Sequence, residues 1–184
     1  MKAGPATALA ALLLAAVPAG PAGAQSAVPC DAPDADPDAD PWVVDFADRV
    51  LRYNGLAGFA VARWGDAVGC VGQETMEFDG ARYGTLELTF AGGVTLLVET
   101  QPIETSIVTL RASSGFDDPA AVEAALRAYA DGVGVDIDWS RPERSDEQAE
   151  ATETFWDPEP GLNASAATVR VGERLVAVRF SMAL

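Results

Sequence analysis

The feature that most constrains the fold is a run of apolar segments separated by tight-turn signals in the middle of the chain. "ETMEF" and "ARYGTLELTF" flank Asp79-Gly80, a dipeptide typical of two-residue hairpin turns. Gly92-Gly93 then leads into "VTLLVET", and Gln101-Pro102 leads into "TSIVTLRA". Successive strands joined by short turns form an antiparallel meander, so this block predicts an antiparallel sheet.

Two amphipathic helices are predicted on either side of this meander. The first covers residues 41–53, where Asp40-Pro41 supplies a helix start and Asn54-Gly55 a stop. The second extends from Asp118-Pro119 to Asp131-Gly132, with apolar residues at helical spacing. Each helix has one apolar face to bury, which favours packing against the sheet.

The remaining segments complete an α+β fold. Residues 57–64 and 67–72 suggest a hairpin about Gly65-Asp66, and "VDIDW" (135–139) suggests a short strand. Residues 141–163 are acidic and rich in proline and glycine, which predicts a long loop, and "ATVRV" and "RLVAVRFSM" then predict a final hairpin. We therefore expect an antiparallel β-meander with two main helices packed on one face and a C-terminal β-hairpin.

The N-terminus has the pattern of a cleaved secretory signal. Residues 1–24 combine Lys2, an apolar run and small residues before the expected cleavage between Ala24 and Gln25. The alternative is a retained anchor, but the run holds about 12 residues and a spanning helix needs about 20. Residues 25–40 alternate Asp, Ala and Pro, which predicts a disordered arm, and 41–184 are expected to form one domain.

The two cysteines, Cys30 and Cys70, are predicted to form one disulfide. A lipid anchor at Cys30 would need the cysteine directly after the apolar run, and zinc would need four nitrogen or sulfur ligands, whereas the chain has no histidine. Two cysteines in an exported chain most simply pair with each other, although a mixed or intermolecular disulfide is the competing reading.

The charge of the chain limits its partners. Its formal net charge is −16, and removal of the leader with Lys2, the only lysine, leaves 11 arginines against 28 acidic residues. Such a charge repels nucleic acids and anionic membranes and favours cations or basic partners. Export and the exclusive use of arginine point to the periplasm or the medium of a Gram-negative bacterium, with no membrane insertion after cleavage.

Several carboxylate groups are weak candidates for a metal or acid–base site. Asp34, Asp36, Asp38 and Asp40 alternate with other residues but lack the central glycine and closing glutamate of a calcium loop. Asp136 and Asp138 would share one strand face. Glu87, Glu99 and Glu104 could meet across the meander, where Arg82 and Arg111 could equally neutralise them. For each group an exposed polar surface is the simpler interpretation, so no metal or cofactor is assigned.

The aromatic pair Phe155-Trp156, within "ETFWDPEPGLN", is the strongest candidate binding feature. These aromatics either fold back onto the core as a lid or anchor a partner, because aromatics ringed by polar residues are typical of binding hot spots. Since the mature chain lacks histidine and lysine, we expect a binding or accessory module that engages a protein partner. The alternatives are a carboxylate-based cell-envelope hydrolase and a calcium-stabilised structural protein.

Overall fold

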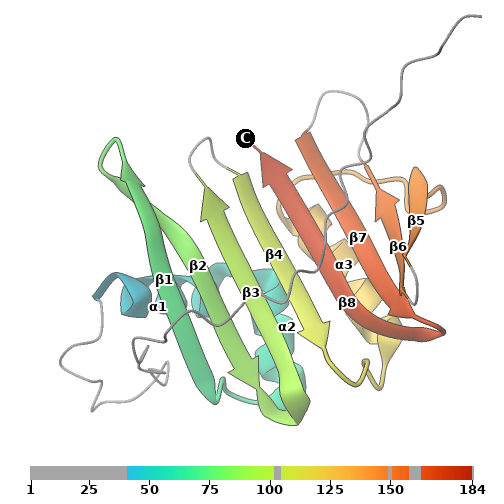
Figure 1. Cartoon of the computed structure of the whole chain (residues 1–184), viewed down its shortest axis with the longest axis horizontal. Helices are drawn as coiled ribbons and strands as arrows, with labels where there is room; N and C mark the ends of the chain where they lie inside the picture. The colour runs from blue at the N-terminus through green and yellow to red at the C-terminus, as the bar shows by residue number, and fades with distance from the viewer. Residues whose placement is uncertain (1–40, 102–104, 149–150, 158–162, 184) are drawn as a thin grey trace, which may run out of the picture.

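One eight-stranded antiparallel sheet, with helices on one of its faces, organises the computed structural model (Figure 1). The structure describes residues 41–101, 105–148, 151–157 and 163–183. Its elements are, in chain order, α1 (Pro41–Tyr53), α2 (Gly55–Trp64), β1 (Gly69–Phe78), β2 (Ala81–Phe90), the 3-10 turn η1 (Ala91–Gly93), β3 (Val94–Gln101), β4 (Thr105–Ala112), α3 (Pro119–Gly132), β5 (Arg144–Gln148), β6 (Ala151–Trp156), β7 (Asn163–Val171) and β8 (Arg174–Ala183).

The strand order is β1-β2-β3-β4-β8-β7-β6-β5, so two meanders meet where β4 pairs with β8. This arrangement confirms the expected α+β fold, the central meander and the C-terminal hairpin of β7 and β8. The β1–β2 turn has positive φ at both central residues, 50° at Asp79 and 76° at Gly80. A two-residue turn of this kind matches the twist of the paired strands, as the Asp-Gly signal predicts.

Helix α1 lies close to the β1–β2 hairpin because two glycines leave room for it. Val43 packs over Gly72, where an added Cβ would come within 2.5 Å of the valine Cγ1. Trp42 packs over Gly84, where an added Cβ would come within 2.5 Å of the indole Cη2. Strand glycines are characteristic of such close approaches, and these two fix the position of α1 on the sheet.

The prediction of a strand over residues 57–64 is wrong, because these residues belong to helix α2. The side-chain oxygen of Asn54 accepts hydrogen bonds from the backbone N–H groups of Leu56 (3.0 Å) and Ala57 (3.1 Å). Asn54 therefore caps a second helix directly after α1 instead of ending helical structure. Its amide also donates to the Tyr129 hydroxyl (3.2 Å), which links the α1–α2 junction to α3.

The prediction of a strand at 135–139 is also wrong. Val135 and Ile137 are buried and the intervening Asp136 is exposed, as the alternation suggests, but the segment joins no sheet. The backbone N–H of Val135 donates instead to the carbonyl oxygen of Ala130 (3.0 Å). The segment is thus held by the end of α3, and its apolar side chains are buried beside that helix.

Residues 141–163 are not a continuous loop, since they contain the strands β5 and β6. Strand β6 pairs with β7, with Phe155 opposite Ala167 and Trp156 opposite Ala166. These two strands form the end of the sheet, and the residues of β6 are half-buried except for Phe155, which is buried. Residues 149–150 and 158–162 of the expected loop lie outside the described residues.

Helix α3 forms as the sequence predicts and packs on β7 and β8. A side-chain oxygen of Asp118 accepts from the backbone N–H of Ala121 (3.1 Å), which satisfies one of the open donors of the first turn. Figure 1 shows the three helices behind the sheet, with α1 and α2 over the β1–β3 half and α3 over the other half. In the described part of the chain, no helix has the length and hydrophobicity needed to cross a bilayer.

Candidate functional site

Phe155 and Trp156 point to opposite faces of the sheet, because they are neighbours in strand β6. Phe155 is buried on the face without helices, where the guanidinium carbon of Arg179 lies 5.8 Å from its ring centroid. Trp156 is half-buried on the helix face, and its ring centroid lies 5.8 Å from that of Trp139. The two side chains therefore do not form one aromatic patch, and Trp156 lines a cavity that Phe155 does not line.

The cavity beside Trp156, which we call the tryptophan cavity, has a volume of about 250 Å³. It lies between α3, the segment after α3, and strands β6 and β7, and is lined by Glu123, Leu126, Arg127, Trp139, Thr154, Trp156, Thr168 and Arg170. The indole N–H of Trp156 is buried and has no acceptor within the described residues. A buried donor without an acceptor costs free energy, so the described residues leave this hydrogen-bonding group of Trp156 unsatisfied.

Charged groups surround the tryptophan cavity in close contact with one another. The Arg170 guanidinium donates to Glu123 Oε1 at 2.5 Å, and both side chains are only partly exposed. The guanidinium carbon of Arg127 lies 5.5 Å from the ring centroid of Trp139, in cation–π geometry. The cavity thus presents aromatic surface together with an ion pair.

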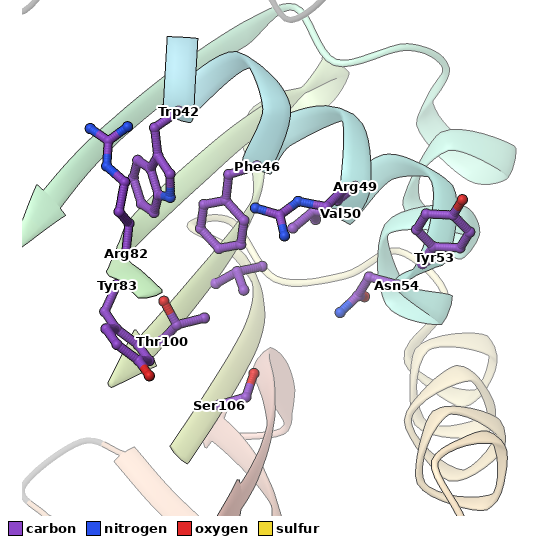
Figure 2. Close-up of a pocket in the computed structure, with 11 residues that line it drawn as sticks. Trp42, Phe46, Arg49, Val50, Tyr53, Asn54, Arg82, Tyr83, Thr100 and Ser106 are labelled. Carbon is purple, nitrogen blue, oxygen red and sulfur yellow. The ribbon is translucent and has the colours of Figure 1, made fainter. Parts of the chain in front are cut away.

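A larger groove lies between α1 and strands β2, β3 and β4, and Figure 2 shows the side chains along it. Its volume is about 360 Å³. The residues that line it are Trp42, Phe46, Arg49, Val50, Tyr53, Asn54, Arg82, Tyr83, Val98, Thr100 and Ser106. We call this site the α1 groove.

The α1 groove is open because small polar side chains occupy the strand ends next to it. Thr100 Oγ1 accepts from the backbone N–H of Gly84 (3.0 Å) and donates to its carbonyl oxygen (3.2 Å), so this side chain is held against the sheet. Ser106 occupies the neighbouring position on β4, opposite Thr100. The inner face of α1, with Trp42 and Phe46, therefore overhangs a floor that no large side chain fills.

Arginine side chains supply the charge of the α1 groove. Arg49 is paired with Asp45 at 3.1 Å on the exposed surface of α1. Arg82 is paired with Glu74, and its guanidinium carbon lies 5.8 Å from the ring centroid of Trp42. Of the groove-lining residues, all within the described chain, two carry a positive charge and none carries a negative one. This is unusual in a chain with a net charge of −16.

The carboxylates that the sequence singled out are not gathered into one site. Asp138 Oδ1 accepts from the backbone N–H (3.0 Å) and the hydroxyl (2.6 Å) of Ser140, and these bonds lower the pKa of the Asp138 carboxyl. Glu87 is paired with Arg111 at 2.7 Å, and Glu99 lies opposite Thr85 rather than opposite Glu87. No group of potential metal ligands occurs among the residues that the structure describes. Glu104 and the candidate calcium ligands Asp34, Asp36, Asp38 and Asp40 lie outside those residues.

The proposed cysteine pair is only half described. Cys70 is buried in β1, opposite Leu88 of β2. Cys30 lies outside the described residues, as do the leader and the expected cleavage point between Ala24 and Gln25. The Cys30–Cys70 disulfide therefore stays a prediction.

Sequence reasoning missed the α1 groove, although one signal pointed toward it. The apolar face of the helix at 41–53 was expected to pack on the sheet, and nothing in the linear sequence places Arg49 and Arg82 along one groove. Gly84, however, interrupts an otherwise regular strand, and an isolated strand glycine often marks the close approach of another element.

Comparisons of the chain with protein-family models, with curated proteins and with solved structures found no match.

Proposed function

We propose that this chain is an exported binding module that engages a protein partner through the α1 groove. The observation that carries the proposal is the set of residue types in the groove, which includes one tryptophan, two tyrosines and two arginines. These three types dominate the hot spots of protein interfaces, because they combine large contact area with hydrogen-bonding ability. Support for export comes from the leader pattern in the sequence.

The length of the groove suits a short extended segment of a partner. Its residues on α1 extend from Trp42 to Tyr53, which is about 16 Å at 1.5 Å per helical residue (Figure 2). An extended chain covers about the same distance with five residues at about 3.3 Å each. Tyr53, at the far end, has 82% of its surface exposed, so its ring is available for contact.

Charge in the groove favours a segment with an acidic or carbonyl-rich end. Arg49 makes one exposed ion pair, with Asp45, and exposed pairs of this kind contribute at most about 1 kcal/mol. A guanidinium has five N–H donors, so it can bind a partner oxygen while keeping a contact to its own carboxylate. The rest of the acidic surface would still attract basic regions of the same partner.

Site-specific photo-crosslinking tests the proposal. A photoreactive amino acid in place of Tyr53, at the exposed end of the groove, should capture one dominant protein in the cells that make this chain. The same probe in place of Val133, which is exposed near the end of α3, should not capture that protein. Identical products from both positions would contradict the proposal.

A pair of matched variants then tests the groove itself. Arg49 and Arg52 are both in α1, and each is paired with an aspartate four residues earlier, but only Arg49 lines the groove. Arg49→Glu should abolish most of the capture at position 53, whereas Arg52→Glu should leave it unchanged. Equal effects of the two substitutions would show that helix charge, and not the groove, controls the interaction.

The structure offers no specific support for the two alternatives. A carboxylate-based hydrolase needs two facing carboxyl groups. Among the described residues that line the two cavities, Glu123 is the only one with a carboxyl group, and it is paired with Arg170. A calcium-stabilised protein would have to use the Asp-rich arm outside the described residues. We therefore propose no second function.

A further inference from the structure

The tryptophan cavity is separate from the α1 groove and differs from it in chemistry. The groove lies along α1 over β2–β4, and the cavity lies beside α3 over β6 and β7. The two sites share no lining residue. The cavity, with a volume of about 250 Å³, is below the usual size of drug-like pockets, so it suits one small ring rather than a peptide.

Two walls of the cavity are aromatic. The indole rings of Trp139 and Trp156 are tilted by 45° with their centroids 5.8 Å apart, so they pack against each other and form one aromatic corner of the cavity. Arg127 supports this corner through its cation–π contact with Trp139. Such walls favour a ligand with C–H groups on its faces, because these bury apolar surface against the rings.

The remaining walls carry both hydrogen-bond donors and acceptors. Thr168 is 5% exposed and is the only buried polar residue in the part of the chain that the structure describes. Glu123 uses one carboxylate oxygen in its contact with Arg170, while Thr154 adds a second hydroxyl to the lining. A ligand here must both donate and accept hydrogen bonds, or these groups lose water without compensation.

We propose that the tryptophan cavity binds a single sugar ring. A sugar presents C–H groups to the indoles, and its hydroxyls both donate to Glu123 and accept from Arg127, Arg170 or the threonines. A purely apolar ligand would leave the polar walls unpaired, and a small inorganic anion would leave the indole faces without contact. A ring with apolar faces and hydroxyl groups on its edge matches every wall of the cavity.

Intrinsic fluorescence titration tests this proposal, because two of the four tryptophans line the cavity. The probes are glucose, galactose, mannose and N-acetylglucosamine, with benzene and inorganic phosphate as the apolar and anionic comparisons. At least one sugar should give a saturable change with a Kd of about 1 mM or below. Failure of all four sugars to saturate, or saturation by benzene or phosphate alone, would overturn the proposal.

Two conservative variants locate the binding. Thr168→Val and Glu123→Gln each remove hydrogen-bonding ability with little change of shape, and each should weaken sugar binding about tenfold, the loss expected for one hydrogen bond. The matched control is Glu87→Gln, which breaks the ion pair with Arg111 outside the cavity and should leave binding unchanged. The melting temperature of Thr168→Val shows whether this variant is folded. If the folded variant binds the sugar with the same affinity as the unsubstituted protein, the assignment of the site is overturned.

Discussion

The contact between Gly72 and Val43 permits a quantitative test of how α1, one wall of the groove, is held on the sheet. A methyl group at position 72 would come within 2.5 Å of Val43 Cγ1 and 2.9 Å of its Cγ2. Gly72→Ala alone should therefore destabilise the protein by about 2 kcal/mol, a typical cost of overpacking. Val43→Ala alone should cost about 2 kcal/mol, because it deletes two buried methyl groups.

The double variant should recover much of this loss. With Val43 shortened, the methyl group of Ala at position 72 occupies the space that the valine methyl groups leave. The double variant should thus be destabilised by about 2 kcal/mol instead of the additive value of about 4 kcal/mol, a coupling within the range seen for contacting residues. Urea unfolding followed by tryptophan fluorescence measures all three values, provided that the m-value is unchanged.

Val44 supplies the control for these measurements, because it is on the same helix but 40% exposed. The losses of stability caused by Val44→Ala and Gly72→Ala should therefore add in the double variant. If the Gly72 and Val43 effects also add to within about 0.5 kcal/mol, α1 does not lie on β1 through this contact. The description of the groove wall would then be incorrect.

Three further outcomes follow from individual side chains. Trp156→Phe should leave stability unchanged or raise it by about 1 kcal/mol, because it removes a buried N–H for which the described residues supply no acceptor, whereas Trp64→Phe should lower it in the same denaturation assay. Gly58→Ala should stabilise the protein by about 0.5–1 kcal/mol, since a Cβ there meets nothing within 4 Å and α2 gains a better helix former. Burial raises the pKa of Tyr129 above its usual value of about 10. The protein should therefore lose stability as the pH rises through that native pKa, and Asn54→Ala, which deletes a hydrogen bond that lowers the pKa, should move tyrosinate absorbance to still higher pH.

Local signals predicted much of the fold. Asp79-Gly80 specified its hairpin because the turn that forms has positive φ at both central residues, and Asp-Gly is one of the pairs that adopt it most readily. Asp118-Pro119 specified the start of α3 because the cap and the fixed proline φ act within one helical turn. In both cases the deciding interactions lie within four residues of one another, so the sequence contains them directly.

Local reasoning failed where tertiary contacts decided the structure. Asn54-Gly55 serves equally as the end of one helix or the start of the next, and the burial of Leu56 and Ala60 in the core favours the second helix. The alternation in "VDIDW" correctly predicted which side chains are buried, but burial beside a helix gives the same pattern as burial under a sheet. Period-two burial alone therefore does not establish a strand.

The two cavities depend on contacts between distant segments, which the sequence does not display. Phe155-Trp156 was a reasonable signal, yet it could not show that the pairing of β6 with β7 would separate the two rings. Residues 49 and 82 line the same groove, and residues 127 and 156 line the same cavity. Only the register of the sheet and the position of each helix determine these neighbours.

Helix coverage explains why both sites form where they do. The half of the sheet made by β8, β7, β6 and β5 is about 19 Å wide at about 4.8 Å per strand, while a packed helix covers only about 10 Å. Helix α3 therefore leaves about half of this face uncovered, and the segment with Trp139 fills it only in part, which creates the tryptophan cavity. On the other half, α1 and α2 lie on β1–β3, so the groove opens where this coverage ends next to β4. A large apolar residue in place of Ser106 should therefore fill the α1 groove and leave the tryptophan cavity open. A large apolar residue in place of Thr168 should fill the tryptophan cavity and leave the groove open.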